Sequence, residues 1–416
     1  MDTLREAPLD VGGRPPHPFL YTLLIVPFGA SSGFVTVALA FLATRNGLTV
    51  TQGAALVAAA IFPNVWKFFW APVADKTLTR KRWYVLSTIG VAISMFAMAT
   101  LPLKPSTLGL MTVLVLTSSV LATFVGFSVE SMVAHLTPPA HRGSVSGWFQ
   151  AGNLGGGGLG GGLGLWLLST LPSPWMAGAI MAALMIACCI PLRFVPDVPA
   201  EKSAGSVVEG MKYVGADLWQ VMKSKNGILC SVLCILPIGT GAAQGVLAQA
   251  EVAHFWGAGV AQVALVQGAL TGLVSMAGCL AGGAVCARWL NGRTAYAVFG
   301  GLMALTTGVT AVLPATVAVF VTFNLVYAFV TGLCYAAFSN FVFDAIGAGH
   351  AATKYNGFAS ISNTPIWYTG LVLAWADTRL GPRGMLTTES MMGVAGIAVF
   401  ATALFIMRGV TETVEG

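Results

Sequence analysis

Two acidic residues lie inside long apolar segments of the sequence, where a charged side chain is costly. Glu130 precedes Pro138 by eight residues, so at helical rise it lies about 12 Å from the end of its segment. Asp344 occupies the equivalent place in the second half of the chain. A carboxyl group that changes protonation as its solvation changes is suited to proton coupling. The alternative is a permanent ion pair, which we favour for Asp344 and leave open for Glu130.

One lysine also lies within an apolar segment and is the obvious intramembrane partner for Glu130. Lys67 follows Asn64 by three residues, so both side chains lie on the same helix face. A cation at this depth needs a reason. Lys67 either neutralises an acid across a helix contact or attracts a carboxylate or phosphate group of a solute. We favour a structural or gating role, and we keep Lys67 and Asn64 as candidate substrate contacts.

Further polar and aromatic side chains are scattered through other apolar segments. Amides within hydrocarbon normally face other helices or a cavity. Each residue alone is explained as a contact between helices, whereas together they predict a polar, aromatic site for a bulky hydrophilic solute. The remaining candidate substrate-binding residues are Gln150, Asn153, Gln244, Asn340, Asn363 and Trp367.

Several other kinds of chemistry lack their characteristic motifs. The glycine run Gly155–Gly164 has neither the Lys-Ser/Thr of a phosphate loop nor a preceding strand, so it predicts close helix packing instead. The five histidines show no metal-ligand spacing, and the seven cysteines include no CxxC pair. We therefore expect no catalytic residues, no metal, no cofactor and no nucleic-acid partner.

The composition identifies a polytopic membrane protein. Of its residues 56% are hydrophobic and only 9% are charged, against roughly 25% charged in soluble domains. Apolar runs of about 20 residues without alternation indicate membrane helices rather than a barrel. The predicted segments are 19–44, 51–74, 83–103, 107–136, 144–170, 174–194, 227–250, 259–288, 294–314, 316–346, 352–376 and 388–408.

Basic residues set the predicted orientation. With both termini in the cytoplasm, sixteen Lys and Arg residues fall in the tails and inner loops and four fall in the outer loops. No signal-peptide apolar region precedes the first segment, so we expect residues 1–18 to form a cytoplasmic tail. Residues 409–416 form the other tail.

The chain divides into two similar halves. The long connection 195–225, with an amphipathic helix expected from its periodicity, separates residues 19–194 from 226–408. Pro27-x-Gly29 recurs 210 residues later as Pro237-x-Gly239. Glu130 and Asp344 each stand thirteen residues before a glycine. These offsets indicate duplication of a six-helix unit.

The stretch Lys67-Phe-Phe-Trp-Ala-Pro-Val-Ala-Asp75, followed by a basic turn, carries a family resemblance. It resembles the loop between the second and third helices of the major facilitator superfamily, and more narrowly the motif of the peptide/acetyl-CoA transporter family. The generic superfamily turn has glycine where Ala71 and Leu78 stand here. The resemblance implies an all-α membrane protein with twelve transmembrane helices in two pseudo-symmetric six-helix bundles, the major facilitator fold.

The same resemblance implies a gate at the inner end of the second helix. Asp75, with Arg80 and Arg82 of the basic turn, would hold this gate closed. Helices one, four, seven and ten would line a central cavity, which places Glu130 and Asp344 on cavity-lining helices.

These observations predict a secondary active transporter in the cell inner (plasma) membrane. It would take up a bulky polar solute, muropeptide-like or siderophore-like, by proton-coupled alternating access. We expect its partners to be a small-molecule substrate, protons and the lipid bilayer, and we expect a monomer. The alternatives are a membrane-embedded acyl or glycosyl transferase, and a facilitator for acetyl-CoA or another organic anion. An enzyme would need clustered catalytic groups, which the scattered acids do not supply.

The charge asymmetry predicts the topology directly. A reporter fused after Gly416 or inserted within 195–225 should be cytoplasmic, and one placed near Lys104 or Arg383 should be external. Protease protection of the reporter in sealed vesicles measures this. An external central loop would overturn the orientation of every span.

Overall fold

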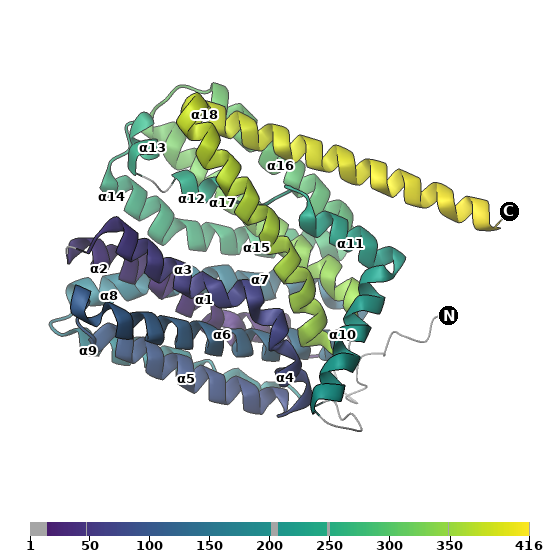
Figure 1. Ribbon diagram of the computed structural model, residues 1–416, viewed down its shortest axis with the longest axis horizontal. Helices are drawn as coiled ribbons and strands as arrows, with labels where there is room; N and C mark the ends of the chain where they lie inside the picture. Colours follow the sequence, from purple (N-terminus) through teal and green to yellow (C-terminus); the bar gives the residue numbers. More distant parts are fainter. Residues whose placement is uncertain (1–14, 47, 201–206, 248–249, 348, 416) are drawn as a thin grey trace. The chain divides into compact units, whose positions relative to one another are not determined.

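A computed structural model describes residues 15–46, 48–200, 207–247, 250–347 and 349–415 as helices and their connections (Figure 1). Within these residues eight helices are long and apolar enough to cross a membrane. The predicted all-α fold is therefore confirmed. The eight are Pro18–Ala43, Arg80–Thr100, Pro105–Leu136, Pro174–Phe194, Leu265–Arg288, Gly292–Val312, Val317–Ile346 and Ala351–Met407.

The chain forms two units, which we describe separately. Unit 1 comprises the described residues within Met1–His141, Trp148–Gly215 and Gly347–Asn356. In it, α5 packs against α6 and α9, and α6 also packs against α1 and α3. Its elements are α1 Pro18–Gly33, η1 Phe34–Leu39, α2 Ala40–Arg45, α3 Val50–Trp66, η2 Lys67–Phe69, α4 Ala71–Lys76, α5 Arg80–Thr100, η3 Pro105–Thr107, α6 Leu108–Leu136, η4 Pro139–His141, η5 Leu159–Leu163, α8 Gly164–Thr170, α9 Pro174–Ala187 and η6 Ile190–Phe194.

Unit 2 comprises the described residues within Arg142–Gly147, Ala216–Ile346 and Gly357–Gly416. Here α17 is the central helix, because α11, α12, α15 and α16 all contact it. Its elements are α11 Lys225–Ile235, α12 Ala243–Leu247, α13 Ala250–Phe255, α14 Val260–Val263, η7 Ala264–Leu270, α15 Thr271–Arg288, α16 Gly292–Val312 and α17 Val317–Ile346.

Three helices belong partly to each unit: α7 Arg142–Gly158, α10 Val207–Lys223 and α18 Ala351–Glu415. The start of α7 packs on α15, where Gly143 and Gly147 lie against the backbone of Cys279, Gly283 and Ala287. The start of α18 belongs to unit 1 instead. Each unit therefore contains a short segment from the other half of the sequence.

The two predicted segments 352–376 and 388–408 form one long helical stretch with a break. Gly381 interrupts α18 with φ 70°, a left-handed conformation that glycine adopts without strain. Between the segments, Pro382 follows this glycine. The break therefore separates the eleventh predicted helix from the twelfth.

The predicted continuous helix 227–250 is interrupted in the structure. It ends at Ile235 and resumes at Ala243, and in between Gly239 and Gly241 have φ values of 61° and 69°. Pro237 contributes to the interruption, since it has no N–H to continue the helical ladder. The matching Pro27 lies inside α1, which runs on without unwinding. The sequence repeat is thus not a conformational repeat at this position.

The glycines of the fifth predicted segment, 144–170, allow α1 to approach that segment closely. A Cβ atom added at Gly29 would lie 2.0 Å from the Asn153 carbonyl oxygen, and one at Gly160 would lie 2.0 Å from that of Ala30. The glycine run also contains a π-helical turn, η5. This agrees with the close packing predicted for Gly155–Gly164.

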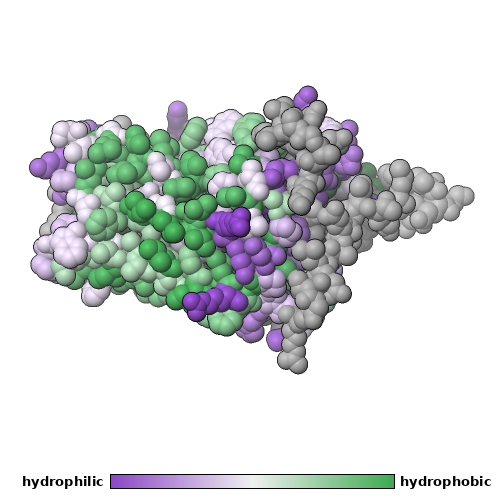
Figure 2. Space-filling model, turned by 90° about the horizontal axis from the view of Figure 1, so that it is seen from below, coloured by the Kyte–Doolittle hydropathy of each residue, from purple (hydrophilic) through white to green (hydrophobic). Residues whose placement is uncertain are grey.

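The surface is consistent with a lipid environment. Figure 2 shows one face on which hydrophobic side chains are widespread, with hydrophilic side chains at its left edge and in a group right of its centre. Large apolar side chains such as Ile93, Leu110 and Trp166 are exposed. Exposed apolar area of this extent marks a surface covered by another apolar phase.

The close approach of α1 predicts an asymmetric response to added methyl groups. Gly29→Ala should lower the thermal midpoint of the detergent-solubilised protein, because overpacking destabilises by about 1–3 kcal/mol. Gly109→Ala is the matched control, since nothing lies within 4 Å of its added Cβ. Equal midpoints for both variants in a thermal unfolding assay would contradict the backbone contact.

Candidate functional site

Glu130 is a buried acid at the centre of unit 1. It lies on α6, and 3% of it is exposed. Its Oε2 accepts a hydrogen bond from the Asn356 side chain at 2.5 Å, and Asn356 also donates to the Ala352 carbonyl at 2.7 Å. Ala352 lies in the first turn of α18 and Asn356 in the second. The predicted depth of Glu130 thus agrees with its burial, and its polar partner is an amide from the far half of the sequence.

Lys67 lies where the second predicted helix is interrupted. Pro72 has no N–H to donate to the Phe68 carbonyl, and α3 gives way to the short turn η2 before α4 begins. Lys67 is 7% exposed, and its Nζ lies 5.5 Å from the Phe28 ring centroid. Its charge also interacts with that of Glu130. The arrangement is compatible with both roles predicted for this lysine.

Asp75 is fully buried and accepts hydrogen bonds on both carboxylate oxygens. Oδ1 pairs with Arg80 Nη2 at 3.2 Å. Oδ2 accepts from the Thr353 backbone N–H at 3.0 Å and from the Thr353 hydroxyl at 2.7 Å. Thr353 lies in the first turn of α18, where backbone N–H groups lack helical acceptors. The carboxylate therefore tethers the start of α18 to the end of α4.

Arg80 is as buried as Asp75 and is held from several sides. It donates to the Ala74 and Asp75 carbonyls, and its Nε donates to Ser131 Oγ at 2.8 Å. Arg82, the other predicted gating residue, is exposed, and its backbone N–H bonds to the capping Thr79 hydroxyl at 3.4 Å. The predicted gating group thus divides into a buried pair and an exposed arginine.

A second polar group of unit 1 joins two predicted substrate contacts. Asn153 Nδ2 donates to Gln150 Oε1 at 2.9 Å, and Gln150 Nε2 donates to the Tyr355 hydroxyl at 3.3 Å. Tyr355 again belongs to the first turns of α18. Asn64 lies apart, half-buried on α3, with its amide donating to the Ala60 carbonyl at 3.5 Å.

The predicted residues of unit 2 do not share these features. Asp344 lies near the end of α17, its side chain is 48% exposed, and it pairs with Arg142 at 3.3 Å. This placement favours the structural role that the sequence indicated. Of the other candidates, Asn340 is buried, Gln244 and Asn363 are half-buried, and Trp367 is exposed.

The set of site residues predicted from the sequence omits three residues of these networks. Thr353 and Asn356 supply the bonds to Asp75 and Glu130, and no periodic pattern marks them. Glu389 is a buried acid of unit 2 that accepts a hydrogen bond from Tyr327 at 2.5 Å. The available signal for Glu389 was its place just inside the last apolar segment, 388–408, where it resembled an interfacial residue.

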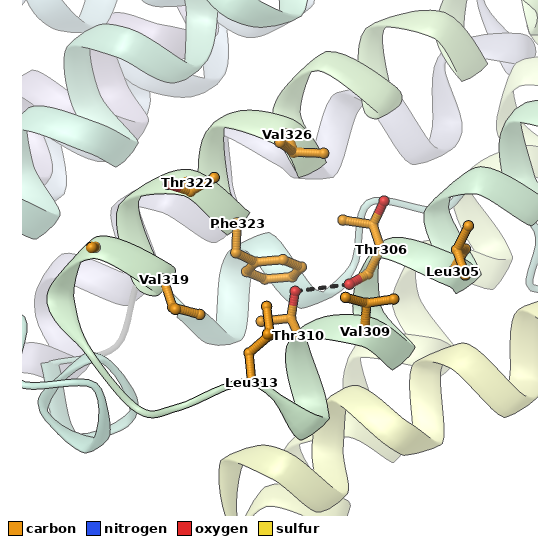
Figure 3. A pocket seen from close by; sticks show the side chains of 10 residues that line it. Leu305, Thr306, Val309, Thr310, Leu313, Val319, Thr322, Phe323 and Val326 are labelled. Carbon is orange, nitrogen blue, oxygen red and sulfur yellow. Dashed lines mark hydrogen bonds between the residues drawn. The ribbon is translucent and has the colours of Figure 1, made fainter.

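A groove of about 450 Å³ lies between α16 and α17 (Figure 3). No predicted site residue lines it. The hydroxyls of Thr306 and Thr310 donate to helix carbonyls at 2.7 and 2.8 Å, so they offer little to a polar solute. With apolar walls that include Phe323 and Val326, the groove suits hydrocarbon rather than the predicted solute.

The fold and these buried polar networks belong to a known class of membrane protein. The model of the Major Facilitator Superfamily matches residues 21–370, and the chain belongs to this superfamily. It is a multi-pass membrane protein and a secondary transporter, not an enzyme. The narrower peptide/acetyl-CoA transporter resemblance stays a prediction.

Solved structures share the fold at low sequence identity. The chain is similar to the human organic anion transporter MFSD10 (TETRAN), with a TM-score of 0.69, 19% identity, and coverage of 93% of this chain and 100% of that one. The chain is also similar to FucP in the outward conformation, with a TM-score of 0.67, 15% identity, and coverage of 93% of this chain and 97% of that one. It is similar as well to the proton:xylose symporter XylE bound to 6-bromo-6-deoxy-D-glucose, with a TM-score of 0.65, 14% identity, and coverage of 94% of this chain and 95% of that one. No curated protein matches the sequence.

The Asp75 contacts predict that Thr353 holds the first turn of α18 in place. Ala352 is fully buried beside Ala71 and Ala74, so a cysteine there should be protected from a thiol reagent. Asp75→Asn or Thr353→Val should raise labelling of Ala352→Cys about tenfold. Asp75→Asn removes the buried charge that accepts the Thr353 hydrogen bonds, and Thr353→Val removes the hydroxyl that donates to this charge. Peptide mapping separates this label from the native cysteines.

The control for this experiment is Thr306→Val in α16. Its hydroxyl serves only the Leu302 carbonyl of its own helix, so labelling of Ala352→Cys should not change. Unchanged labelling in both the Asp75 and Thr353 variants would contradict the prediction that the Asp75–Thr353 bonds hold the first turn of α18 in place.

Proposed function

We propose that this transporter couples solute uptake to protons and that Glu130 carries the coupling proton. The supporting observation is the burial of Glu130, which accepts a hydrogen bond from the Asn356 amide and interacts electrostatically with Lys67. A carboxylate in such a place is stabilised by a small number of contacts, so its charge state depends on whether those contacts persist. This is the property that a coupling residue requires.

The contacts also suggest how a proton would alter the conformation. The ionised Glu130 accepts a charge-assisted bond from Asn356, which is stronger than a bond to a neutral acid. Protonation would weaken this bond and remove the attraction to Lys67. The start of α18 would keep the Asp75–Thr353 bonds and the Gln150–Tyr355 bond. Proton binding would thereby loosen one attachment of this segment while the others persist.

The proposed solute is bulky and polar, in the manner of a muropeptide or a siderophore. The family resemblance of Lys67 to Asp75 supports this class. So do the linked amides of Gln150 and Asn153, which offer further donors and acceptors. Within unit 2, considered separately, Asn340 is a buried amide whose oxygen has no hydrogen bond in the described structure. Uptake would occur across the cell inner membrane, with both termini cytoplasmic.

A facilitator for an organic anion is the second candidate. The observation in its favour is Lys67, a buried cation under the Phe28 ring that could face an anionic group. The similar fold of the human organic anion transporter is compatible with this candidate. A facilitator would equilibrate the anion without accumulating it against a gradient, which separates it from the coupled transporter.

Replacing Glu130 tests the coupling. In proteoliposomes with labelled muropeptide and ferric-siderophore probes, an imposed pH gradient should drive accumulation by the natural protein. Glu130→Gln keeps the shape and the acceptor for Asn356 while it removes the titration. It should abolish accumulation driven by the pH gradient and leave exchange at equal pH largely intact. Full accumulation by a well-folded variant would end the coupling proposal.

The double variant separates coupling from simple charge pairing. If Glu130 serves only to neutralise Lys67, Glu130→Gln should fold poorly, because it leaves a buried charge unopposed. Lys67→Met combined with Glu130→Gln should then restore both stability and coupled transport. Under the coupling proposal, the double variant is also folded but does not accumulate solute when a pH gradient is imposed.

A further inference from the structure

Glu389 lies in a part of unit 2 that the proposed function does not use. It belongs to the portion of α18 beyond Gly381, and only 6% of it is exposed. The adjacent Ser390 hydroxyl donates to the Ala304 carbonyl at 2.7 Å, which seats this helix on α16. Glu389 is therefore held within the unit by packing and not left in a loose surface position.

The contacts of its two oxygens differ. Oε1 accepts hydrogen bonds from the Tyr327 hydroxyl at 2.5 Å and the Ala243 N–H at 3.3 Å. Oε2 is buried and has no hydrogen-bond partner in the described structure. A carbonyl oxygen with two donors and a hydroxyl oxygen without one is the pattern of a protonated carboxyl group. A carboxylate would leave one negatively charged oxygen bare in an apolar interior.

The Ala243 N–H is free to donate because the predicted helix 227–250 is unwound just before this residue. Ala243 begins α12 directly after the break between Ile235 and Ala243, so its N–H is not used by a continuing helix. The same N–H approaches the Tyr327 hydroxyl at 3.2 Å. Ile238 and Pro237 of the break lie against Gly396 on the helix that carries Glu389. The unwound segment and the acid thus form one packed group.

Among the described residues, the charged and titratable groups around Glu389 supply no cation. On α17 these groups are Tyr327 and Cys334, and on α16 the group is Tyr296, which donates to the Ile238 carbonyl at 2.7 Å. The unwound segment contains no ionisable side chain. Arg383, on the same helix as Glu389, donates to the Leu313 carbonyl and lies over the Phe255 ring.

We propose that Glu389, together with Tyr327 and the unwound segment before Ala243, forms a second proton-binding site of this transporter. The bound proton resides on Oε2, while Oε1 accepts the two hydrogen bonds. Release of the proton requires that water or a cation reach Oε2, which is buried in this structure. This site lies in unit 2 and does not depend on the proposed role of Glu130.

Infrared difference spectroscopy tests the site without knowledge of the solute. Full-length protein with Glu130→Gln is used, so that Glu130 contributes no signal. Stepping the pH should produce a difference band of a protonated carboxylic acid, and adding Glu389→Gln should eliminate it. Asp344→Asn, which removes an exposed acid in the same unit, is the matched control and should leave the band in place.

Tyr327→Phe provides a second test that retains the acid. It removes the shortest hydrogen bond to Oε1, so the carbonyl band should move to higher frequency while its pH dependence persists. This variant decides the matter if Glu389→Gln does not fold. The proposal would be overturned if the Glu130→Gln protein, with Glu389 intact, gave no carboxylic-acid difference band. It would also be overturned if this band did not change with pH over the range in which the protein is stable.

Sodium binding is the alternative occupant and gives a different result. Thermal midpoints measured at fixed pH in NaCl and in KCl should be equal if the site binds a proton. A stabilisation specific to NaCl that Glu389→Gln abolishes would overturn the proton assignment in favour of a sodium site.

Discussion

The buried Asp75 carboxylate is the constraint on which the arrangement of unit 1 depends. A fully buried anion must be neutralised and hydrogen-bonded, and Arg80 and Thr353 meet this need on opposite oxygens. Thr353 and Asn356 are three residues apart in one helix, so they lie on the same face. Fixing Thr353 at Asp75 therefore brings Asn356 to Glu130. One turn of α18 responds to the charges of two acids that lie on different helices.

The sequence was informative where the physics is local. Apolar length predicted the spans, as the agreement of 107–136 with α6 and of 316–346 with α17 illustrates. The basic turn after Asp75 placed Arg80 within reach of it. The bonds from Thr353 and Asn356 were not predictable, because they join residues more than 200 positions apart. Contacts of that range depend on tertiary packing, which spacing along the chain does not encode.

The predicted repeat of the two halves accounts for two further differences between prediction and structure. Asp344 was matched to Glu130 by equal distance to a glycine, yet α17 ends two residues after Asp344 whereas α6 continues for six residues after Glu130. Equal spacing therefore gave unequal depth. Pro27 and Pro237 likewise match in sequence, but only the second stands beside glycines in left-handed conformations. The landmarks that match in sequence therefore do not share a conformation.

The close approach of α1 to the glycines of segment 144–170 has an entropic consequence. Where Gly29 and Gly160 meet the opposing backbone, there are no rotatable side chains to be immobilised when the helices pack. Such an interface forfeits little rotamer freedom and depends on dispersion between main-chain atoms. Neighbouring glycines of the same segment meet the side chains of Ile25, Phe34 and Val37 instead. The main-chain contacts therefore set how closely the two helices approach, while these side chains hold their register.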